Sequence, residues 1–77
     1  NMDNEPFTID VIDDGYYAVE GVGVEKMIGY TNIDTEKGFA FFQKYLRDKG
    51  IIDALEEKGI QEGDTVRIYD LEFDYYK

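Results

Sequence analysis

Hydrophobic and polar residues alternate near the start of the chain and again near its end. Apolar residues occupy every second position from Phe7 to Val11, and after Asp13-Asp14-Gly15 a second β-prone run covers residues 16–20. This pattern predicts a β-hairpin, because Gly15 can adopt the positive φ that closes a short loop of a type I turn plus a bulge. Either aspartate can also bond to its own backbone within the turn.

The middle of the chain follows a helical period. Val24, Met27 and Ile28 lie at i, i+3 and i+4, which predicts a short helix between Gly21 and Tyr30. A longer helix should begin at Asp34 as its N-cap, since acidic residues come early and basic residues late in the segment that follows. Its apolar residues form one stripe at about 100° per residue, with Phe41 on the flank. The stripe comprises Phe39, Phe42, Tyr45 and Leu46.

The pattern Leu-x-x-Lys-Gly-Ile occurs twice, at residues 46–51 and 55–60. In each copy the glycine stands where a left-handed residue ends a helix, and the isoleucine after it can fold back onto the leucine one turn earlier. The repeat therefore predicts two successive helix ends, the second closing a helix over about Ile52 to Lys58.

A second hairpin is predicted at the end of the chain. Val66 and Ile68 share one strand face, whereas Leu71 and the apolar residues after it are three residues out of phase with Ile68. A flat strand cannot place both sets on one face, so a tight turn or bulge is expected near Tyr69-Asp70. The resulting order predicts an α+β fold, in which a small antiparallel sheet of two hairpins (ββ-helices-ββ) is covered by two or three short helices. Residues 1–6 are interpreted as a disordered lead-in or expression remnant, and residues 7–77 as a single domain.

Composition restricts the function. The chain has 77 residues and a formal charge of −10, from 18 acidic and 8 basic side chains. Such a charge repels nucleic acids and anionic lipids, so no direct nucleic acid binding is expected. The acidity serves either solubility or attraction to a basic partner. Cysteine is absent and no apolar run reaches the ~20 residues of a membrane helix, so a soluble, cytoplasmic protein without membrane insertion is expected.

The residues predict no active site. The chain lacks His, Cys and Ser, which excludes the common nucleophilic triads and His-ligated metals. The acidic run ending at Gly15 resembles a calcium loop but has Ile12 at a ligand position, and Gly21-Val22-Gly23 has Lys26 in place of the third glycine of a dinucleotide fingerprint. The acidic pairs Glu56-Glu57 and Glu72 with Asp74 are interpreted as parts of solvent-exposed faces. No pocket is expected in a chain of this length. Catalytic, cofactor-binding and metal residues are therefore predicted to be none.

Exposed aromatic side chains are the remaining candidates for function. Tyr69 and Tyr76 interleave with acidic residues and are predicted to face outward, and Phe41 lies on the flank of the long helix. Large rigid rings of this kind can anchor a protein partner. Ordinary cross-strand pairing on a small sheet is the alternative.

Several segments in order resemble one known family, the C-terminal domain of the Obg family of bacterial GTPases (Obg/CgtA). The segments are Phe7-Thr8-Ile9, Asp14-Gly15-Tyr16-Tyr17-Ala18-Val19-Glu20-Gly21, Tyr30-Thr31-Asn32, Phe41-Phe42-Gln43-Lys44-Tyr45-Leu46, the two Lys-Gly-Ile endings, Gly63-Asp64-Thr65-Val66-Arg67-Ile68 and Leu71-Glu72-Phe73. The resemblance covers nearly the whole chain after Pro6. It implies a parent protein with a glycine-rich N-terminal domain and a central GTPase domain that uses GTP and magnesium, and roles in large ribosomal subunit assembly and in growth or stress control.

The chain itself contains no Gly-x-x-x-x-Gly-Lys-Ser/Thr loop and no Asn-Lys-x-Asp motif, so GTP hydrolysis is not expected here. The leading hypothesis is a non-catalytic regulatory or interaction module whose partners are its own parent GTPase domain and ribosomal or regulatory proteins. The alternative is a free-standing acidic module that mimics the charge of nucleic acid, which a single continuous negative face would favour.

Overall fold

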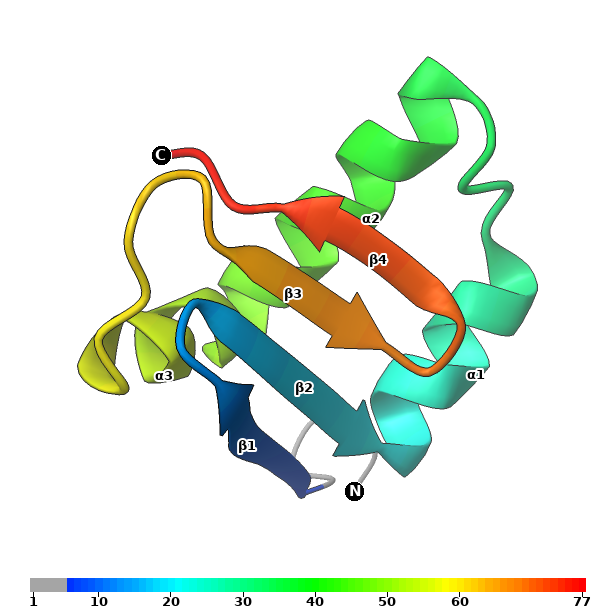
Figure 1. Cartoon of the computed structure of the whole chain (residues 1–77). Helices are drawn as coiled ribbons and strands as arrows, with labels where there is room; N and C mark the ends of the chain where they lie inside the picture. The colour runs from blue at the N-terminus through cyan, green and yellow to red at the C-terminus, as the bar shows by residue number, and fades with distance from the viewer. Residues whose placement is uncertain (1–5) are drawn as a thin grey trace.

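Four strands and three helices follow one another in the order ββ-ααα-ββ in a computed structural model, which describes residues 6–77 (Figure 1). The α+β class and both hairpins are confirmed. Apart from the exposed Pro6, the predicted lead-in lies outside the described residues. The elements are β1 (Phe7–Asp13), β2 (Tyr16–Gly21), α1 (Val22–Tyr30), α2 (Glu36–Asp48), α3 (Ile51–Glu57), β3 (Thr65–Ile68) and β4 (Leu71–Asp74).

The strands form one sheet in the order β1-β2-β3-β4. Each hairpin is antiparallel, but the central strands β2 and β3 run parallel, from the pair Tyr16 and Thr65 to the pair Val19 and Ile68. The sheet is therefore mixed, whereas the sequence predicts antiparallel pairing throughout. The reason is the long helical connection, which returns the chain across the sheet so that β3 starts at the same end as β2.

Both predicted turns are present. In the first, Gly15 has φ +71° and the Asp13 carboxylate accepts the backbone N–H of Asp14 at 2.8 Å. The register shifts between Val11 and Asp13, which confirms the bulge. In the second, two residues join β3 to β4, and Tyr69 there has φ +58°.

The N-cap of α2 differs from the prediction. Thr35, and not Asp34, caps the helix, because its Oγ1 accepts the backbone N–H of Gly38 at 3.0 Å. The same hydroxyl donates to the Asn32 carbonyl oxygen at 2.9 Å. The Asp34 backbone N–H instead bonds to the Asn32 side chain at 3.3 Å, within the preceding turn. Threonine and aspartate are both favoured at the N-cap position, so the sequence does not distinguish them. The path of the preceding turn places Thr35 at the cap.

Glycines end α2 and α3 as the repeated pattern predicts. At the end of α3, Gly59 donates to the carbonyl of Glu56 and Ile60 donates to that of Leu55, which is the pair of bonds of a Schellman motif. At the end of α2, Gly50 has φ +80° and donates to the Arg47 carbonyl, and the chain enters α3 directly. The third helix therefore begins and ends one residue earlier than predicted.

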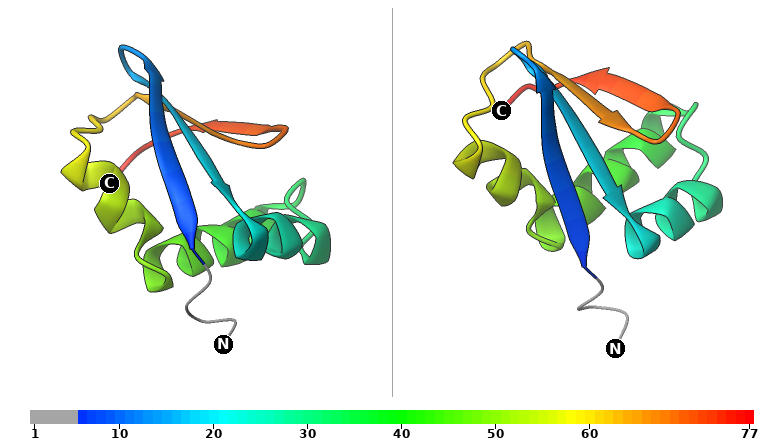
Figure 2. Two further views of the ribbon diagram at one scale, coloured as in Figure 1. Left: turned by 90° about the horizontal axis from the view of Figure 1, so that it is seen from below. Right: turned by 60° about the horizontal axis from the view of Figure 1, so that its bottom comes forward.

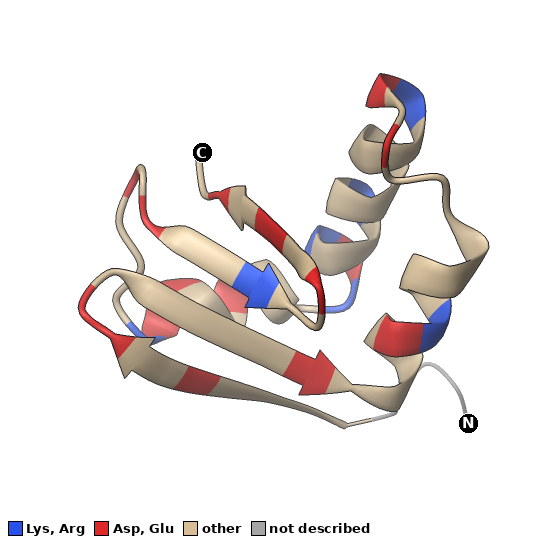
Figure 3. Ribbon diagram, turned by 45° about the vertical axis from the view of Figure 1, so that its right-hand side comes forward, with Lys and Arg blue, Asp and Glu red and all other residues tan. Residues whose placement is uncertain are grey.

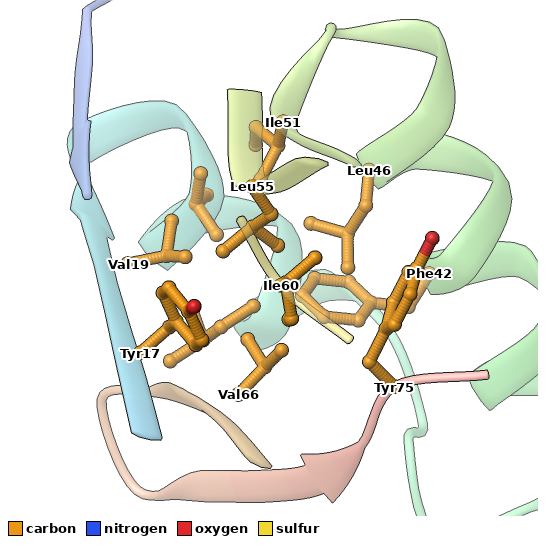
Figure 4. Close-up of a cluster of buried hydrophobic side chains, with 11 residues drawn as sticks. Tyr17, Val19, Phe42, Leu46, Ile51, Leu55, Ile60, Val66 and Tyr75 are labelled. Carbon is orange, nitrogen blue, oxygen red and sulfur yellow. The ribbon is translucent and has the colours of Figure 1, made fainter. Parts of the chain in front are cut away.

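All three helices cover the same face of the sheet (Figure 2). Between the two layers lies one hydrophobic core, to which every element except β1 and β4 contributes fully buried side chains (Figure 4). Phe42 and Leu46 from α2 are fully buried at its centre, as their stripe predicts, while Phe39 and Tyr45 are partly buried. The buried set is Tyr17, Val19, Val24, Phe42, Leu46, Ile51, Leu55, Ile60, Val66, Ile68 and Tyr75.

Candidate functional site

The face of the sheet opposite the helices carries no covering element among residues 6–77 (Figure 2). Alternate residues of each strand point to this open face, because successive side chains on a strand point to opposite sides. One row crosses all four strands in register and holds Asp10, Ala18, Arg67 and Glu72. The open face is thus a continuous surface framed by an acidic residue at each edge.

Acidic residues lie on strands, helices and turns alike, but few basic residues accompany them on the strands (Figure 3). The four strands contain five acidic residues and a single basic residue, Arg67. The helices, in contrast, mix both signs, with six acidic and four basic residues. The field of the domain is therefore more negative on the sheet side.

Arg67 and its neighbours form a small polar cluster on the open face. The Arg67 guanidinium lies 6.0 Å from the centre of the Tyr16 ring, within the range of a cation–π contact. The Tyr16 hydroxyl donates to a Glu72 carboxylate oxygen at 2.6 Å, and this bond is the main reason that the pKa of Tyr16 is raised. The cluster orients the Glu72 carboxylate at the β4 edge.

A groove of about 440 Å³ lies beside β4, between that strand, α2 and α3. Phe39 of α2 and Phe73 of β4 meet on its wall with ring centres 5.4 Å apart in an edge-to-face arrangement. Ile52 and Tyr76 extend the apolar lining, and charged residues of both signs, among them Glu56 and Arg47, also line the groove. The sequence predicts no pocket. The groove exists because segments distant in the chain meet at the sheet edge.

Tyr75 and Glu56 join the C-terminal segment to α3 beside this groove. The Tyr75 side chain is buried, and its hydroxyl donates to a Glu56 carboxylate oxygen at 2.5 Å. This hydrogen bond, then burial and the negative charge of Glu56, raise the pKa of Tyr75 to about 12. Tyr75 therefore stays protonated at neutral pH and holds the groove wall in place.

The three predicted interaction residues lie in different places. Phe41 on α2 and Tyr76 after β4 have exposed fractions of 57% and 67%. Tyr69 lies in the β3–β4 turn and is 36% exposed, and its hydroxyl both accepts from the Gly21 N–H at 2.9 Å and donates to the Gly21 carbonyl at 3.1 Å. Tyr69 thus ties this turn to the start of α1, and a role of the three in binding stays a prediction.

Sequence reasoning missed Phe39 and Glu56 as parts of a surface groove. The helical stripe predicts Phe39 in the core, where it is only partly buried, and the sequence pattern predicts Glu56 on a solvated face. The nearest signal in the sequence was the alternation of aromatic and acidic residues over residues 72–76, which is typical of an edge strand.

Clustered metal ligands and helices able to span a membrane are both absent from residues 6–77. Within residues 6–77, no three or more His, Cys, Asp or Glu side chains are grouped so that they could hold a metal ion. None of the helices in this range combines the length and apolar character needed to cross a bilayer. The features that remain are the acidic open face and the groove at its edge.

These features define a small acidic α+β domain with an uncovered sheet face. The chain belongs to the family described as "Domain of unknown function (DUF1967)", whose model matches residues 7–75. The resemblance to the C-terminal region of Obg-family GTPases is confirmed by its relatives.

Three relatives illustrate this likeness. The chain is 63% identical over 75 residues to the GTPase Obg of Lachnoclostridium phytofermentans, which covers 96% of this chain and 18% of that protein. It is 55% identical over 74 residues to the GTPase Obg of Ruminiclostridium cellulolyticum, covering 96% of the chain and 17% of the relative. It is 46% identical over 76 residues to the GTPase Obg of Acetivibrio thermocellus, covering 99% of this chain and 18% of the relative. The chain thus spans less than a fifth of the length of these curated relatives.

Proposed function

We propose that this chain is a non-catalytic regulatory module of an Obg-family GTPase, which acts by contacting basic protein surfaces through its open sheet face. The observation that carries the proposal is the charge of the four strands, where five acidic residues accompany one arginine. Electrostatic complementarity of this kind speeds association and selects partners of opposite charge. The partners proposed are the GTPase domain of the parent protein and ribosomal or regulatory proteins.

Chemistry is assigned to the rest of the parent protein. GTP and magnesium would bind in its GTPase domain, because the sequence of this chain lacks the phosphate-binding loop and the base-reading motif. Large ribosomal subunit assembly and growth or stress control in the cytoplasm are the processes proposed for the module. Direct binding of GTP or of nucleic acid by the module itself is not part of the proposal.

A second candidate function is charge mimicry, in which the open face occupies the nucleic acid site of a basic protein. The row of residues from Asp10 to Glu72 across the sheet favours it, since acidic residues stand at both ends of one surface. Several other acidic side chains serve the fold instead. Asp64, for example, accepts the backbone N–H of Gln61 at 2.8 Å, as a turn residue does.

The test compares two charge-neutralised forms of the full-length parent protein. One carries Asp10→Asn, Glu20→Gln and Glu72→Gln on the open face, and the control carries Asp53→Asn and Glu57→Gln on α3. We expect the open-face form to change one of two readouts at least threefold: it either weakens co-sedimentation with large ribosomal subunits or alters the rate of GTP turnover. The α3 control should change each readout less than twofold. Equal effects from both forms would refute a role for the open face. Displacement of DNA from a basic protein by the isolated chain would favour mimicry.

A further inference from the structure

The outer edge of β4 presents unpaired backbone groups. In an antiparallel pair, residues alternate between those that bond to the partner strand and those that point away from it. Tyr75 donates its N–H to the Asp64 carbonyl at 2.7 Å, which places Tyr75 and Asp64 at a bonded position of the β3–β4 ladder. By alternation, the backbone N–H and C=O groups of Leu71 and Phe73 point toward β3. Those of Glu72 and Asp74 point away from β3, toward the outer edge of the sheet. As β4 is the last strand of the sheet, these groups form an open edge.

The same edge has a different surface on each side. Toward the helices lies the groove, with Phe39 and Phe73 on its wall and a volume of about 440 Å³. Toward the open face stand the Glu72 and Asp74 carboxylates, and both residues are exposed. A strand added here would turn alternate side chains into the groove and the others toward the two carboxylates.

We propose that the β4 edge binds an extended segment of a partner protein in which apolar residues alternate with lysine or arginine. The segment adds a fifth strand, and its backbone pairs with Glu72 and Asp74. Its apolar side chains enter the groove against Phe39 and Phe73, and its basic side chains meet the carboxylates of the open face. This inference rests on the proposed function and names the partner's chemistry at the edge of the same surface.

A second copy of this chain does not suit the edge. Two β4 strands placed side by side would bring the carboxylates of Glu72 and Asp74 from both copies together, and each chain carries a formal charge of −10. Like charges on neighbouring strands are destabilising, and charged edges are a common protection against self-pairing. A basic segment removes this repulsion, so charge complementarity selects it.

The first test uses a nine-residue synthetic peptide that alternates lysine with valine or leucine. The control peptide has the same composition but places its apolar residues at a helical spacing. We expect the alternating peptide to bind the 77-residue chain at least tenfold more tightly in an NMR titration. Amide hydrogen exchange at Glu72 and Asp74 should slow at least tenfold on binding, because these N–H groups become bonded. Binding that leaves both amides unprotected would overturn the proposal, as would equal affinity for the two peptides.

The second test uses matched variants that each remove two carboxylates, one on β4 and the other on β1 and β2. The double variant Glu72→Gln with Asp74→Asn should bind the alternating peptide at least threefold more weakly than the wild type. Asp10→Asn with Glu20→Gln removes the same charges from β1 and β2 and should change affinity less than twofold. Equal weakening would show general attraction to the acidic face and would refute docking at β4. If the β4 pair makes the chain dimerise without affecting peptide binding, its carboxylates only protect the edge and the proposal is wrong.

A third variant addresses the backbone directly. Glu72→Pro removes one outward N–H without removing a β3–β4 hydrogen bond, a position at which edge strands accept proline. We expect about a tenfold loss of peptide affinity with the thermal midpoint within a few degrees. If Glu72→Pro does not fold, amide hydrogen exchange at Glu72 and Asp74 in the wild-type chain decides whether the peptide pairs with β4. A folded Glu72→Pro variant that keeps full peptide affinity would refute strand addition. If the wild-type chain does not bind the alternating peptide while the full-length protein keeps its open-face effect, strand addition is refuted and the proposed function still stands.

Discussion

Replacing Tyr75 by phenylalanine tests the contact that holds the C-terminal segment beside the groove. The substitution keeps the buried ring and removes the hydroxyl that donates to Glu56 at 2.5 Å. A hydrogen bond to a charged group contributes about 1.5–3 kcal/mol when fully enclosed. Because Glu56 is exposed, solvent reduces this value, and we expect a loss of about 1 kcal/mol. In a domain of this size that loss lowers the thermal midpoint by roughly 4–8 °C.

The assay is urea unfolding at neutral pH of the wild type, Tyr75→Phe, Glu56→Ala and the double variant. This double-mutant cycle isolates the energy of the pair from the other effects of each change. Tyr76→Phe is the matched control, because Tyr76 is the next residue in the chain and its side chain is 67% exposed. This substitution should change the free energy of unfolding by less than about 0.5 kcal/mol. Equal losses for the two tyrosine variants, or a coupling energy near zero, would refute the assigned role of the contact.

The pH dependence follows from the raised pKa of Tyr75. The pKa rises from 10.0 to about 12 on folding, so the neutral phenol is favoured in the folded state. The stabilisation is complete below pH 10, the ordinary value, and is lost as the pH rises through about 12. A titration of phenolate absorbance should therefore show a step near pH 12 whose amplitude falls by one tyrosine in Tyr75→Phe and is unchanged in Tyr76→Phe. An unchanged amplitude near pH 12 in Tyr75→Phe would contradict this assignment.

Five further substitutions test the fold by chemical or thermal unfolding. Thr35→Ala should cost about 1 kcal/mol through loss of the cap of α2, whereas Asp34→Ala should cost less than about 0.5 kcal/mol. Gly38→Ala should cost about 1–3 kcal/mol, since a Cβ there would lie 1.9 Å from a backbone carbonyl oxygen. Gly29→Ala meets nothing within 4 Å and should stabilise α1 by about 0.5–1 kcal/mol. Leu55→Ala removes a fully buried side chain and should cost about 2–5 kcal/mol.

Each of these predictions has an outcome that would contradict it, and for Gly29→Ala that outcome is a loss of stability. An equal or larger loss for Asp34→Ala than for Thr35→Ala would move the cap back to the aspartate. A neutral Gly38→Ala would show that the loop before α2 can retreat from the helix. A loss below about 1 kcal/mol for Leu55→Ala would mean that α3 does not pack on the core as the structure has it.

Local features were predictable from the sequence where neighbouring residues decide them. The turn at Gly15, the glycine ends of α2 and α3, and the odd step between Ile68 and Leu71 all depend on a few adjacent residues. The cap of α2 was placed one residue too early, because two adjacent residues can both cap a helix and the preceding turn selects between them.

The sites were less predictable. The exposure of Phe41 and Tyr76 followed from their positions, but the groove combines Phe39, Ile52 and Phe73 from three elements that are distant in the chain. The hydroxyl bonds of Tyr69 to Gly21 also span 48 residues. No local pattern encodes such distances, since periodicity reports which face a residue occupies and not which residue it meets.

The sequence alone determined the negative charge, the order of elements, the two hairpins and the α2 stripe that packs on the core. Only the tertiary structure decided that β2 and β3 pair in parallel and that the β4 edge opens beside a groove. The physical reason is that strand partners are chosen by how helices and sheet bury a shared apolar surface. That choice depends on contacts between segments distant in the chain.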